Sequence, residues 1–556
     1  MTNREIAEIM DRIADILEIK EDNPFKIRAY RKAARSICHL DEDINYLYKL
    51  NRISEIPGVG KAVKSKIEEL LEKGNCEYYD KLLLDVPSGV LEMLSIPGIG
   101  HKTVKLIYEE LGINNIDDLL KAAQNKEIRK IPGVGGKTEY NIKKGIDLLK
   151  KRTGKVTLGL ALPLAEDFLD HIKESRAVQR ACIVGSVRRG KSLVGDIDIL
   201  VAANDYSRVY QKVSTYKSVR SISSKDSKHI KGKLIYQIDF EIIIVDPDDY
   251  FYSLVWTTGS KEHRNALFKG INPAEFSRVE SEKDVFRKLG LNYIPPELRE
   301  DQGEIEKASN NQLPKLVQEN NLKGDLHVHS DWSDGAHKIN EVVDVAKTMN
   351  YSYIAITDHS KSLPISGGLN EERLSAQGKV IDGLNKNQKD FQILRGIEVD
   401  ILKDGQLDFS DDVLKNLDVV VASVHSNFKL EGEKQTQRII RAIKNEHVDI
   451  IGHLTGRLLN RRSAYELDID KVLEAAADNK IILEINSHPD RLDIDEVIAK
   501  KARDYGIKIA INSDAHHKED LRLVKYGVIN ARRGWLEAEN IVNTWDKEAL
   551  LDYLNK

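Results

Sequence analysis

The sequence has 556 residues, 41% of them hydrophobic, and a formal net charge of −4. This length predicts about two to four domains, and the balanced charge excludes a uniformly basic surface, so any surface for nucleic acid must be local. Cys38, Cys76 and Cys182 form neither a zinc motif nor an even set for disulfides, which indicates a reducing compartment. There is no signal peptide and no apolar run of roughly 18 residues, so we expect a cytoplasmic protein that does not bind membranes.

A short motif occurs three times near the N-terminus. It reads IPGVGKA from Ile56, IPGIGHKT from Ile96 and IPGVGGKT from Ile131, with helical patterns between the copies. Each copy predicts a tight glycine turn before a helix, whose first N–H groups can bind a phosphate. The three copies resemble helix-hairpin-helix elements, which bind the DNA backbone without reading its sequence, and this favours DNA binding over three ordinary helix connections. The glycines expected to contact DNA are Gly58, Gly60, Gly98, Gly100, Gly133 and Gly135.

A basic stretch, NPFKIRAYRKAARSI, precedes the first motif at residues 23–37. A run of this kind is commonly a solvated face, but beside three phosphate-binding motifs we expect it to face DNA. The sequence KKRTGK at 150–155 ends this part of the chain, so the helical DNA-binding domain is predicted to span residues 1–152. The basic side chains concerned are Lys26, Arg28, Arg31, Lys32 and Arg35.

Three strand carboxylates follow. The segment 182–203, CIVGSVRRGKSLVGDIDILVAA, predicts a strand, a Gly-Ser turn and a second strand in which Asp196 and Asp198 share one face. The segment 234–245, LIYQIDFEIIIV, predicts a third strand that carries Asp239. Carboxylates clustered beside an apolar sheet are costly without a cation. They predict a site for Mg²⁺ or Mn²⁺ that supports in-line displacement at phosphorus.

These strands, together with GSVRR and with WTTGSKEH at 256–263, resemble the nucleotidyltransferase core of the family X DNA polymerases. The resemblance implies a palm with a short thumb over residues 153–296, and an N-terminal domain like the 8-kDa and fingers domains of that family. It implies three catalytic metal ligands, Asp196, Asp198 and Asp239. It also implies triphosphate binding by Gly185, Ser186 and Arg189, and a nucleotide sugar beside Thr258 and Gly259.

One lysine invites two interpretations. In family members with lyase activity the Schiff-base lysine follows the first hairpin, and Lys66 matches that position. A Schiff base requires a neutral amine, which Lys61 and Lys64 could favour by their charge. The simpler interpretation of Lys66 is a contact to a DNA phosphate.

The core also departs from the family. Glu241 stands where the family usually has arginine, and Trp256-Thr257 replaces an aromatic pair. Arg264 and Phe268 stand where the family contacts nucleotide and template. These departures predict altered nucleotide selection, and they leave open a chain whose polymerase activity is weak or lost.

The last part of the chain follows a predicted linker at 297–321. From residue 322 to 556 short apolar runs alternate with helical patterns, which predicts a (β/α) barrel whose strand ends converge on one mouth. Candidate ligands stand at these strand ends, without thiolates, and suit two or three Mn²⁺, Zn²⁺ or Fe²⁺ ions. They are His327, His329, Asp334, His359, Glu398, His425, His453, Asp514 and His516.

The motifs HxH, TDH, GIEVD, SVH, GHxxGR and NSDAH resemble the polymerase-and-histidinol-phosphatase (PHP) domain. The resemblance implies a distorted (β/α)7 barrel that hydrolyses phosphate esters. Arg457 of the GR pair is expected to hold substrate phosphate, and Asp358 to orient a ligand. His337, His447 and His488 are expected to be structural.

The order of hairpin domain, polymerase core and PHP domain resembles bacterial and archaeal family X DNA polymerases. It implies a monomeric gap-filling repair polymerase with a metal-dependent 3′–5′ exonuclease or AP-endonuclease-like activity. The substrates would be dNTPs and DNA with gaps, 3′ ends or abasic sites. The alternatives are a repair nuclease with weak or lost synthesis, a small-molecule phosphatase of the histidinol phosphatase kind, and a non-enzymatic DNA-end scaffold.

Overall fold

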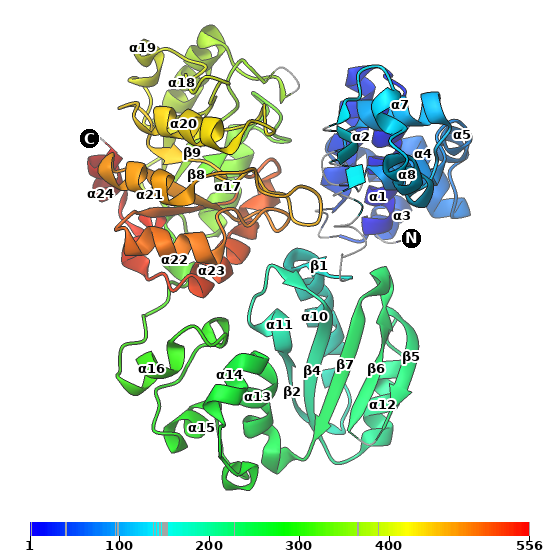
Figure 1. The fold of residues 1–556 in the computed structure, drawn as a ribbon, viewed down its shortest axis with the longest axis vertical. Helices are drawn as coiled ribbons and strands as arrows, with labels where there is room; N and C mark the ends of the chain where they lie inside the picture. The colour runs from blue at the N-terminus through cyan, green and yellow to red at the C-terminus, as the bar shows by residue number, and fades with distance from the viewer. Residues whose placement is uncertain are drawn as a thin grey trace.

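The computed structural model divides into a helical N-terminal domain, a central sheet domain and a C-terminal barrel (Figure 1). It describes residues 1–556 except 2, 39, 41, 95, 97–98, 137, 141, 144–145, 147–153, 227, 364–365, 387 and 555–556. The multidomain fold class predicted from the sequence is confirmed. No helix in the described part of the chain combines the length and apolar character needed to cross a bilayer.

Short helices build the N-terminal domain, and their apolar faces share one core. Gly60 is the N-cap of α4 and Gly100 that of α7, so two of the three motifs lead directly into a helix. Gly58 and Gly133 have φ of +84°, which only glycine adopts at low cost. Gly98 lies outside the described residues. The helices are α1 (Asn3–Ile19), α2 (Pro24–Cys38), α3 (Ile44–Lys49), α4 (Lys61–Lys73), α5 (Glu77–Asp85), α6 (Ser88–Met93), α7 (His101–Leu111) and α8 (Ile116–Gln124).

The central domain is a five-stranded sheet in the order β2-β4-β7-β6-β5. Only β4 and β7 run parallel. Helices α10 (Leu158–Lys173) and α12 (Tyr206–Ser214) cover one face, and α13 (Tyr250–Thr258) packs on the other through Tyr250 and Leu254. The strands are β2 (Val178–Val184), β4 (Asp196–Ala203), β5 (Val219–Lys225), β6 (His229–Leu234) and β7 (Asp239–Val245), beside a small pair β1 (Val156–Thr157) and β3 (Leu193–Val194).

The predicted third strand, residues 234–245, is wrong at its start. Leu234 ends β6, a 3-10 turn covers Ile235–Gln237, and β7 begins at Asp239. Gln237 has φ of +58°, a left-handed conformation that interrupts a strand. The chain therefore turns back here, and Asp239 becomes the first residue of β7.

Helices follow the sheet up to the barrel. They are α14 (Lys261–Leu267), α15 (Glu282–Lys288) and α16 (Glu304–Ser309). A further short helix, α11 (Gly185–Arg188), lies earlier in the chain, in the Gly-Ser turn between β2 and β3. The predicted linker at 297–321 contains α16, and both Arg299 and Glu304 are fully buried. Arg299 donates to Glu282 and stacks near Phe286, so this stretch is packed against the helices before it.

Seven parallel strands form the nearly closed C-terminal barrel, in the order β14-β13-β12-β11-β10-β9-β8. One apolar cluster lies between the strands and the outer helices, and a second fills the interior. The strands are β8 (Gly324–Val328), β9 (Tyr353–Ile356), β10 (Gln392–Asp400), β11 (Val419–Ser423), β12 (Ile450–Ile451), β13 (Ile482–Asn486) and β14 (Ile509–Asn512). The helices are α17 (Ile339–Thr348), α18 (Glu371–Asn385), α19 (Asp411–Leu414), α20 (Gly432–Ile443), α21 (Ile469–Asp478), α22 (Glu496–Asp504), α23 (Val524–Arg533) and α24 (Lys547–Leu554).

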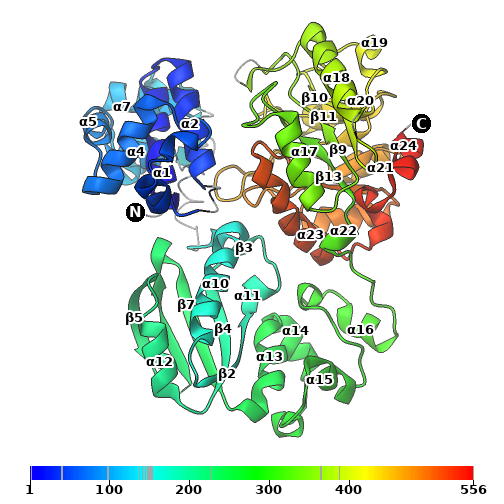
Figure 2. The same cartoon turned by 180° about the vertical axis from the view of Figure 1, so that it is seen from behind.

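The barrel packs directly on the central domain, on the side that carries α22 and α23 (Figures 1 and 2). Leu492 and Tyr526 of the barrel belong to the apolar core of the central domain. A Cβ on Gly159 of α10 would lie 2.4 Å from Cβ of Pro489, and Asn460 donates to the Lys155 carbonyl at 3.1 Å. The two domains therefore share a packed boundary.

Candidate functional site

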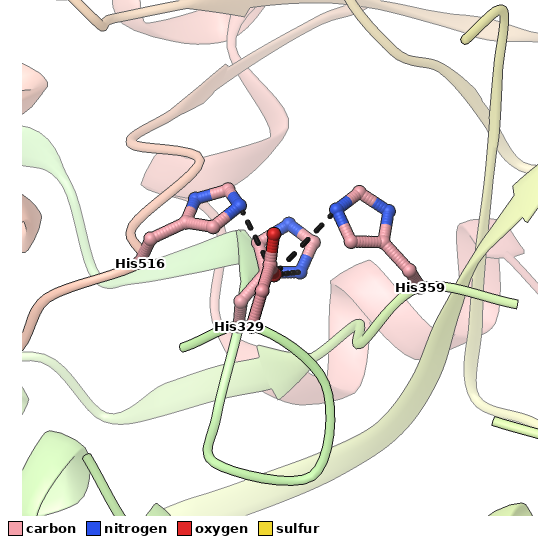
Figure 3. A group of neighbouring side chains, drawn as sticks. His329, His359 and His516 are labelled. Atoms are coloured by element: carbon pink, nitrogen blue, oxygen red, sulfur yellow. Dashed lines mark ion pairs between the residues drawn. The ribbon is translucent and has the colours of Figure 1, made fainter. Parts of the chain in front are cut away.

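All nine predicted ligands lie at the mouth of the barrel. His327 is the penultimate residue of β8, Glu398 lies near the end of β10, and the others stand just beyond β8, β9, β11, β12 or β14. Parallel strands deliver their carboxyl ends to the same rim, which brings these distant positions together. Figure 3 shows the rings of His329, His359 and His516 turned toward a common point.

That point is the carboxylate of Asp334. Its Oδ1 lies 3.3 Å from His516 Nε2, 3.7 Å from His359 Nε2 and 4.0 Å from His329 Nδ1. These four side chains can offer ligand atoms that all lie within 4.8 Å of one another. Two further groups of this kind share members with the first: one is His327, His329 and Asp514, and the other is His359, Glu398 and His425. The mouth can therefore hold more than one ion.

Glu398 bridges these groups. Its Oε1 lies 3.0 Å from His453 Nε2 and 3.1 Å from His425 Nε2. Its Oε2 lies 2.7 Å from His359 Nδ1. Burial alone would raise the pKa of Glu398, but His425, His359 and His327 lower that pKa well below its ordinary value. Glu398 is therefore held as a carboxylate at the centre of the mouth.

The imidazole rings do not share one protonation state. Burial and the neighbouring His516 and His359 lower the pKa of His329 to about 3, which keeps that ring neutral. Burial opposes the charge on His425, yet Glu398 and Asp400 raise its pKa to about 10. Several buried ring nitrogens also lack a hydrogen-bond partner: His327 Nε2, His329 Nδ1 and His453 Nδ1. Buried polar atoms without partners are rare in folded proteins, and this donor set fits divalent metal ions.

The sequence interpretation missed two carboxylates behind the ligands. Glu484 of β13 accepts from His327 Nδ1 at 2.7 Å and from the His453 amide at 2.7 Å. Asp400 lies 3.0 Å from His425 Nδ1. Such contacts fix the orientation of a metal-binding ring. The signal was present, because an acidic residue in the apolar strands LEIN and GIEVD needs a partner when it is buried.

Asp358 fixes a loop. It accepts from the Ser330 amide at 2.8 Å and the Ser333 amide at 3.2 Å, and from Gln377 Nε2 at 2.5 Å. The loop that it holds carries His329 and Asp334 into the mouth.

Arg457 does not lie with its guanidinium open to the mouth. Its nitrogens donate to the Arg491 and Leu492 carbonyls and to Asp495. Arg491 instead lies at the mouth, with Nε 3.8 Å from Asp514 Oδ2. The terminal nitrogens of Arg491 have no hydrogen bond or ion pair with the described residues. Sequence reasoning missed Arg491, because it follows no metal-binding motif.

The second acidic cluster lies on the central sheet. Parallel pairing sets Asp196 beside Asp239 and Asp198 beside Glu241, so all four side chains share the face that α13 covers. Burial raises the pKa of Asp198 to about 7, with Asp196 and Glu241 adding to the shift. The pKa of Asp196 is raised by burial, Glu241 and Asp239. Crowding of this kind is what a bound cation relieves.

The Gly-Ser turn closes on these acids. Gly185 has φ of +63°, and a Cβ there would lie 2.1 Å from Asp198 Oδ2, so no other residue fits. The buried Ser186 Oγ has no hydrogen-bond partner. An unsatisfied hydroxyl beside carboxylates fits a ligand with phosphate oxygens and its metal ions.

Other residues that were predicted to bind metal or nucleotide at this site already contact neighbouring groups. Arg189 donates to Glu300 at 3.0 Å and to the Thr258 carbonyl at 2.8 Å. Asp239 pairs with Lys233 at 2.8 Å. Gly259 lies against His263, since a Cβ there would lie 2.7 Å from Cδ2 of that ring.

The departures from the family pattern pack against one another. Phe268 lies against Trp256 with ring centroids 5.6 Å apart, and the Arg264 guanidinium lies 5.5 Å from the Trp256 ring. Glu241 pairs with His229 at 2.6 Å and Lys231 at 3.0 Å, on the neighbouring strand. Three of the departures thus pack as one unit around the Trp256 ring, and Glu241 is paired with Lys231 and His229 of β6.

In the N-terminal domain Lys66 donates to the Ala62 carbonyl at 3.0 Å, with its Nζ 4.6 Å from the centroid of the Tyr78 ring. Arg31, which was expected to face DNA, is already paired within the domain. Its guanidinium pairs with three carboxylates of α1, those of Asp11, Asp15 and Glu18, and these attractions outweigh the cost of burying it.

Comparison with known proteins agrees with this architecture. Family models match a helix-hairpin-helix domain at residues 1–76, a SAM-like helix-hairpin-helix tandem at 90–147, a DNA polymerase beta thumb at 265–300 and a PHP domain at 325–488. Together with the acidic sheet and the histidine-rich barrel, these domains define a modular DNA-binding polymerase class with an appended PHP domain.

The similarity extends over the whole chain. The DNA polymerase/3′-5′ exonuclease PolX of Bacillus subtilis is 35% identical over 560 residues, covering 98% of this chain and 97% of the relative. This chain belongs to the PolX family. A probable phosphatase of Thermoanaerobacter pseudethanolicus is 33% identical over 244 residues, which cover 42% of this chain and 94% of that protein.

Replacing Glu484 tests the support behind the ligands. We expect Glu484→Gln to weaken the binding of Mn²⁺ or Zn²⁺ to the metal-free protein by about 10- to 100-fold, because His327 and His453 lose their common anchor. Isothermal titration calorimetry with the metal ion measures the affinity. Glu474→Gln, on the exposed side of α21, is the control and should bind as the wild type does. Equal affinity in both variants would contradict the assigned role of Glu484.

The crowding of acids on the central sheet predicts that the stability of the folded chain depends on pH. The pKa of Asp198 in the folded chain, about 7, exceeds its ordinary value of 3.8, so ionisation of Asp198 opposes folding and its cost develops as pH rises between these values. Without divalent ions, Asp198→Asn should therefore be more stable than the wild type at pH 8, by at least about 1 kcal/mol, and not at pH 4.

Urea unfolding at the two pH values measures this difference. Mg²⁺ at pH 8 should stabilise the wild type and leave Asp198→Asn nearly unchanged. Asp170→Asn, at an exposed position of α10, is the control. A wild type that is at least as stable as Asp198→Asn at pH 8 would contradict the prediction.

Proposed function

We propose that this chain is a DNA repair enzyme that extends primers at the central sheet and shortens 3′ ends at the barrel mouth. The observation that carries the proposal is the convergence of nine nitrogen and oxygen ligands on one rim, in a chain that belongs to the PolX family. The acidic face of β4 and β7 supplies the second site.

At the barrel mouth the metal ions would be two or three Mn²⁺, Zn²⁺ or Fe²⁺. When bound, they polarise a phosphodiester and make water nucleophilic near neutral pH. His329, Asp334, His359 and His516 would hold one ion, and Glu398 would bridge to the positions served by His425 and His453. His327 and Asp514 would complete the set, with Glu484 and Asp400 keeping the rings oriented.

At the sheet Asp196, Asp198 and Asp239 would hold two Mg²⁺ or Mn²⁺ ions, which neutralise the charge that develops during transfer of a nucleotidyl group. Gly185 leaves room for the triphosphate, Ser186 donates its unpaired hydroxyl, and Arg189 supplies positive charge. Thr258 and Gly259 would lie beside the incoming sugar. Asp239 would also accept the proton of the primer hydroxyl.

The N-terminal domain would bind the DNA backbone around a gap, a 3′ end or an abasic site. The glycine turns at Gly58, Gly60, Gly100, Gly133 and Gly135 would bring phosphate close to the main chain, and Gly60 and Gly100 stand at helix N-termini, where free N–H groups favour it. For Lys66 we favour a phosphate contact over a lyase role, because its Nζ already donates to the Ala62 carbonyl and lies over the Tyr78 ring, and attack on a sugar would require it to give up both contacts.

Two variants separate the sites. On a gapped, labelled primer-template with Mn²⁺ and dNTPs, Asp196→Ala should abolish extension and keep 3′ shortening. His327→Ala should do the reverse. Each loss should exceed about 100-fold, since each variant removes a metal ligand from one site only. Gel analysis of primer length measures both activities in one reaction.

Three results would redirect the proposal. Shortening without any extension by the wild type would make the chain a nuclease and assign the loss of synthesis to the aromatic unit of Trp256 and Phe268. Faster hydrolysis of histidinol phosphate than of a DNA 3′ end would favour a small-molecule phosphatase. Neither activity in a metal-loaded protein would favour a DNA-end scaffold.

We further propose that Arg491, in preference to Arg457, holds the substrate phosphate at the barrel mouth. The guanidinium of Arg491 lies beside Asp514 with its terminal nitrogens unpaired among the described residues, whereas Arg457 is occupied by the loop that carries Arg491. Arginine binds phosphate oxygens through paired N–H groups, a geometry that lysine does not reproduce.

Arg491→Ala should reduce kcat/KM for 3′ shortening by about tenfold or more, and Arg491→Lys should give a kcat/KM between those of Arg491→Ala and the wild type. The metal content of both variants should be unchanged. Arg461→Ala, a mostly exposed arginine on the neighbouring loop, is the control. Degradation of a labelled single-stranded oligonucleotide measures the rate. Wild-type kcat/KM in Arg491→Ala would exclude the assignment.

A further inference from the structure

A buried arginine of the barrel reaches the proposed nucleotide site. Arg533 ends α23, its side chain is only 2% exposed, and its Nη1 donates to the carbonyl of Arg189 at 2.8 Å. The same nitrogen donates to Glu300 at 3.1 Å, and Nη2 donates to Glu496 at 2.9 Å. A charge so deeply buried is costly unless it is paired, and Glu300 and Glu496 supply that pairing, although the Nε of Arg533 has no hydrogen-bond partner among the described residues.

Glu300 connects this arginine to the nucleotide site. Its Oε1 accepts from Arg533, from Arg189 Nε at 3.0 Å and from Lys191 Nζ at 3.2 Å, and its side chain is 10% exposed. One carboxylate oxygen is thus shared by three cations. Because Arg533 takes part of that negative charge, Glu300 does not fully neutralise Arg189.

Packing also holds the turn formed by Arg189 and Gly190. Gly190 has φ of +68°, and a Cβ there would lie 2.1 Å from Cγ2 of Ile529 on α23. The Arg189 Nη1 donates to the Thr258 carbonyl, while Nη2 has no hydrogen bond or ion pair with the described residues. The barrel therefore contacts the main chain of the turn directly and acts on the charge balance of Arg189 through Glu300, while the Thr258 carbonyl orients the guanidinium.

We propose that Arg533 is a positioning residue for nucleotide binding: the barrel, through Glu300, holds Arg189 ready for the triphosphate at the central sheet. This inference rests on the proposed nucleotidyl transfer. It makes the PHP domain part of the polymerase site, although none of its residues contacts the nucleotide. Without Arg533, Glu300 would pair more fully with Arg189, and the turn would lose the donor to its carbonyl.

The test compares Arg533→Met with Arg532→Met in the full-length chain. Arg532 is its neighbour on α23 and contacts Glu297 and the Val317 carbonyl, so it shares the interface and not Glu300. We expect Arg533→Met to raise the KM for dNTP in gap filling by about tenfold, the size expected for one charge-assisted hydrogen bond. Calorimetric titration with dATP and Mg²⁺ should show the same change in Kd.

The other activities of each variant identify a merely structural effect. The KM for gapped DNA and the rate of 3′ shortening should change by less than about twofold in Arg533→Met. Arg533→Lys should recover part of the nucleotide affinity because it keeps the charge. Arg532→Met should match the wild type in all assays.

Several outcomes overturn the inference. These are a wild-type nucleotide affinity in Arg533→Met, an equal loss in Arg532→Met, a parallel loss of 3′ shortening and DNA binding, or no binding of dATP by the wild type. Failure of the proposed polymerase function is distinguishable, because a wild type that binds dATP but extends no primer still allows the Kd comparison. Under that result a tenfold weaker Kd in Arg533→Met supports the inference.

Discussion

Parallel pairing of strands is the constraint on which both candidate sites depend. In the barrel it delivers the carboxyl ends of all seven strands to one rim, where Glu398 meets five histidines. In the central domain the one parallel pair, β4 and β7, sets Asp196 beside Asp239 and Asp198 beside Glu241. An antiparallel pair would carry these acids to opposite ends of the sheet. The same rule of chain direction therefore produces two clusters of charge on two unrelated sheets.

Each cluster is costly to the folded protein and is compensated differently. At the barrel mouth, histidines and carboxylates are mixed, so ion pairs offset much of the cost of burial. On the sheet the four acids have the same sign, and the compensation comes from the neighbouring strand: Lys233 and Lys231 supply positive charge, and His229 lies 2.6 Å from Glu241. This difference explains why the pKa of Glu398 is lowered while the pKa of Asp198 is raised. A divalent cation relieves the second cluster more directly, since there repulsion dominates.

The boundary between barrel and sheet links these sites. Two barrel loops pack on the central domain, one through Leu459 and the other through Leu492. The first loop follows β12 and begins close to His453, and the second follows β13, which carries Glu484. Arg457 holds these two loops together. Beyond them, α23 supports the turn of Arg189. Residues that shape one site are thus a few positions from residues that contact the other domain, and the domains form a single packed unit.

The sequence by itself determined the domain order, the (β/α) alternation and the candidate ligands that gather at the barrel mouth, because strand ends and metal-binding residue types are local patterns. The strand that carries Asp196 and Asp198 was predicted, while the start of β7 was missed, since a left-handed turn at Gln237 has no strong local signal. Only the tertiary structure decided which charges are already paired. Arg31 is bound by α1, Arg457 by its own loop, and Arg189 by Glu300 and α23 of the barrel. The physical reason is that an ion pair depends on distance in space, and its partners here lie up to hundreds of residues apart in the chain.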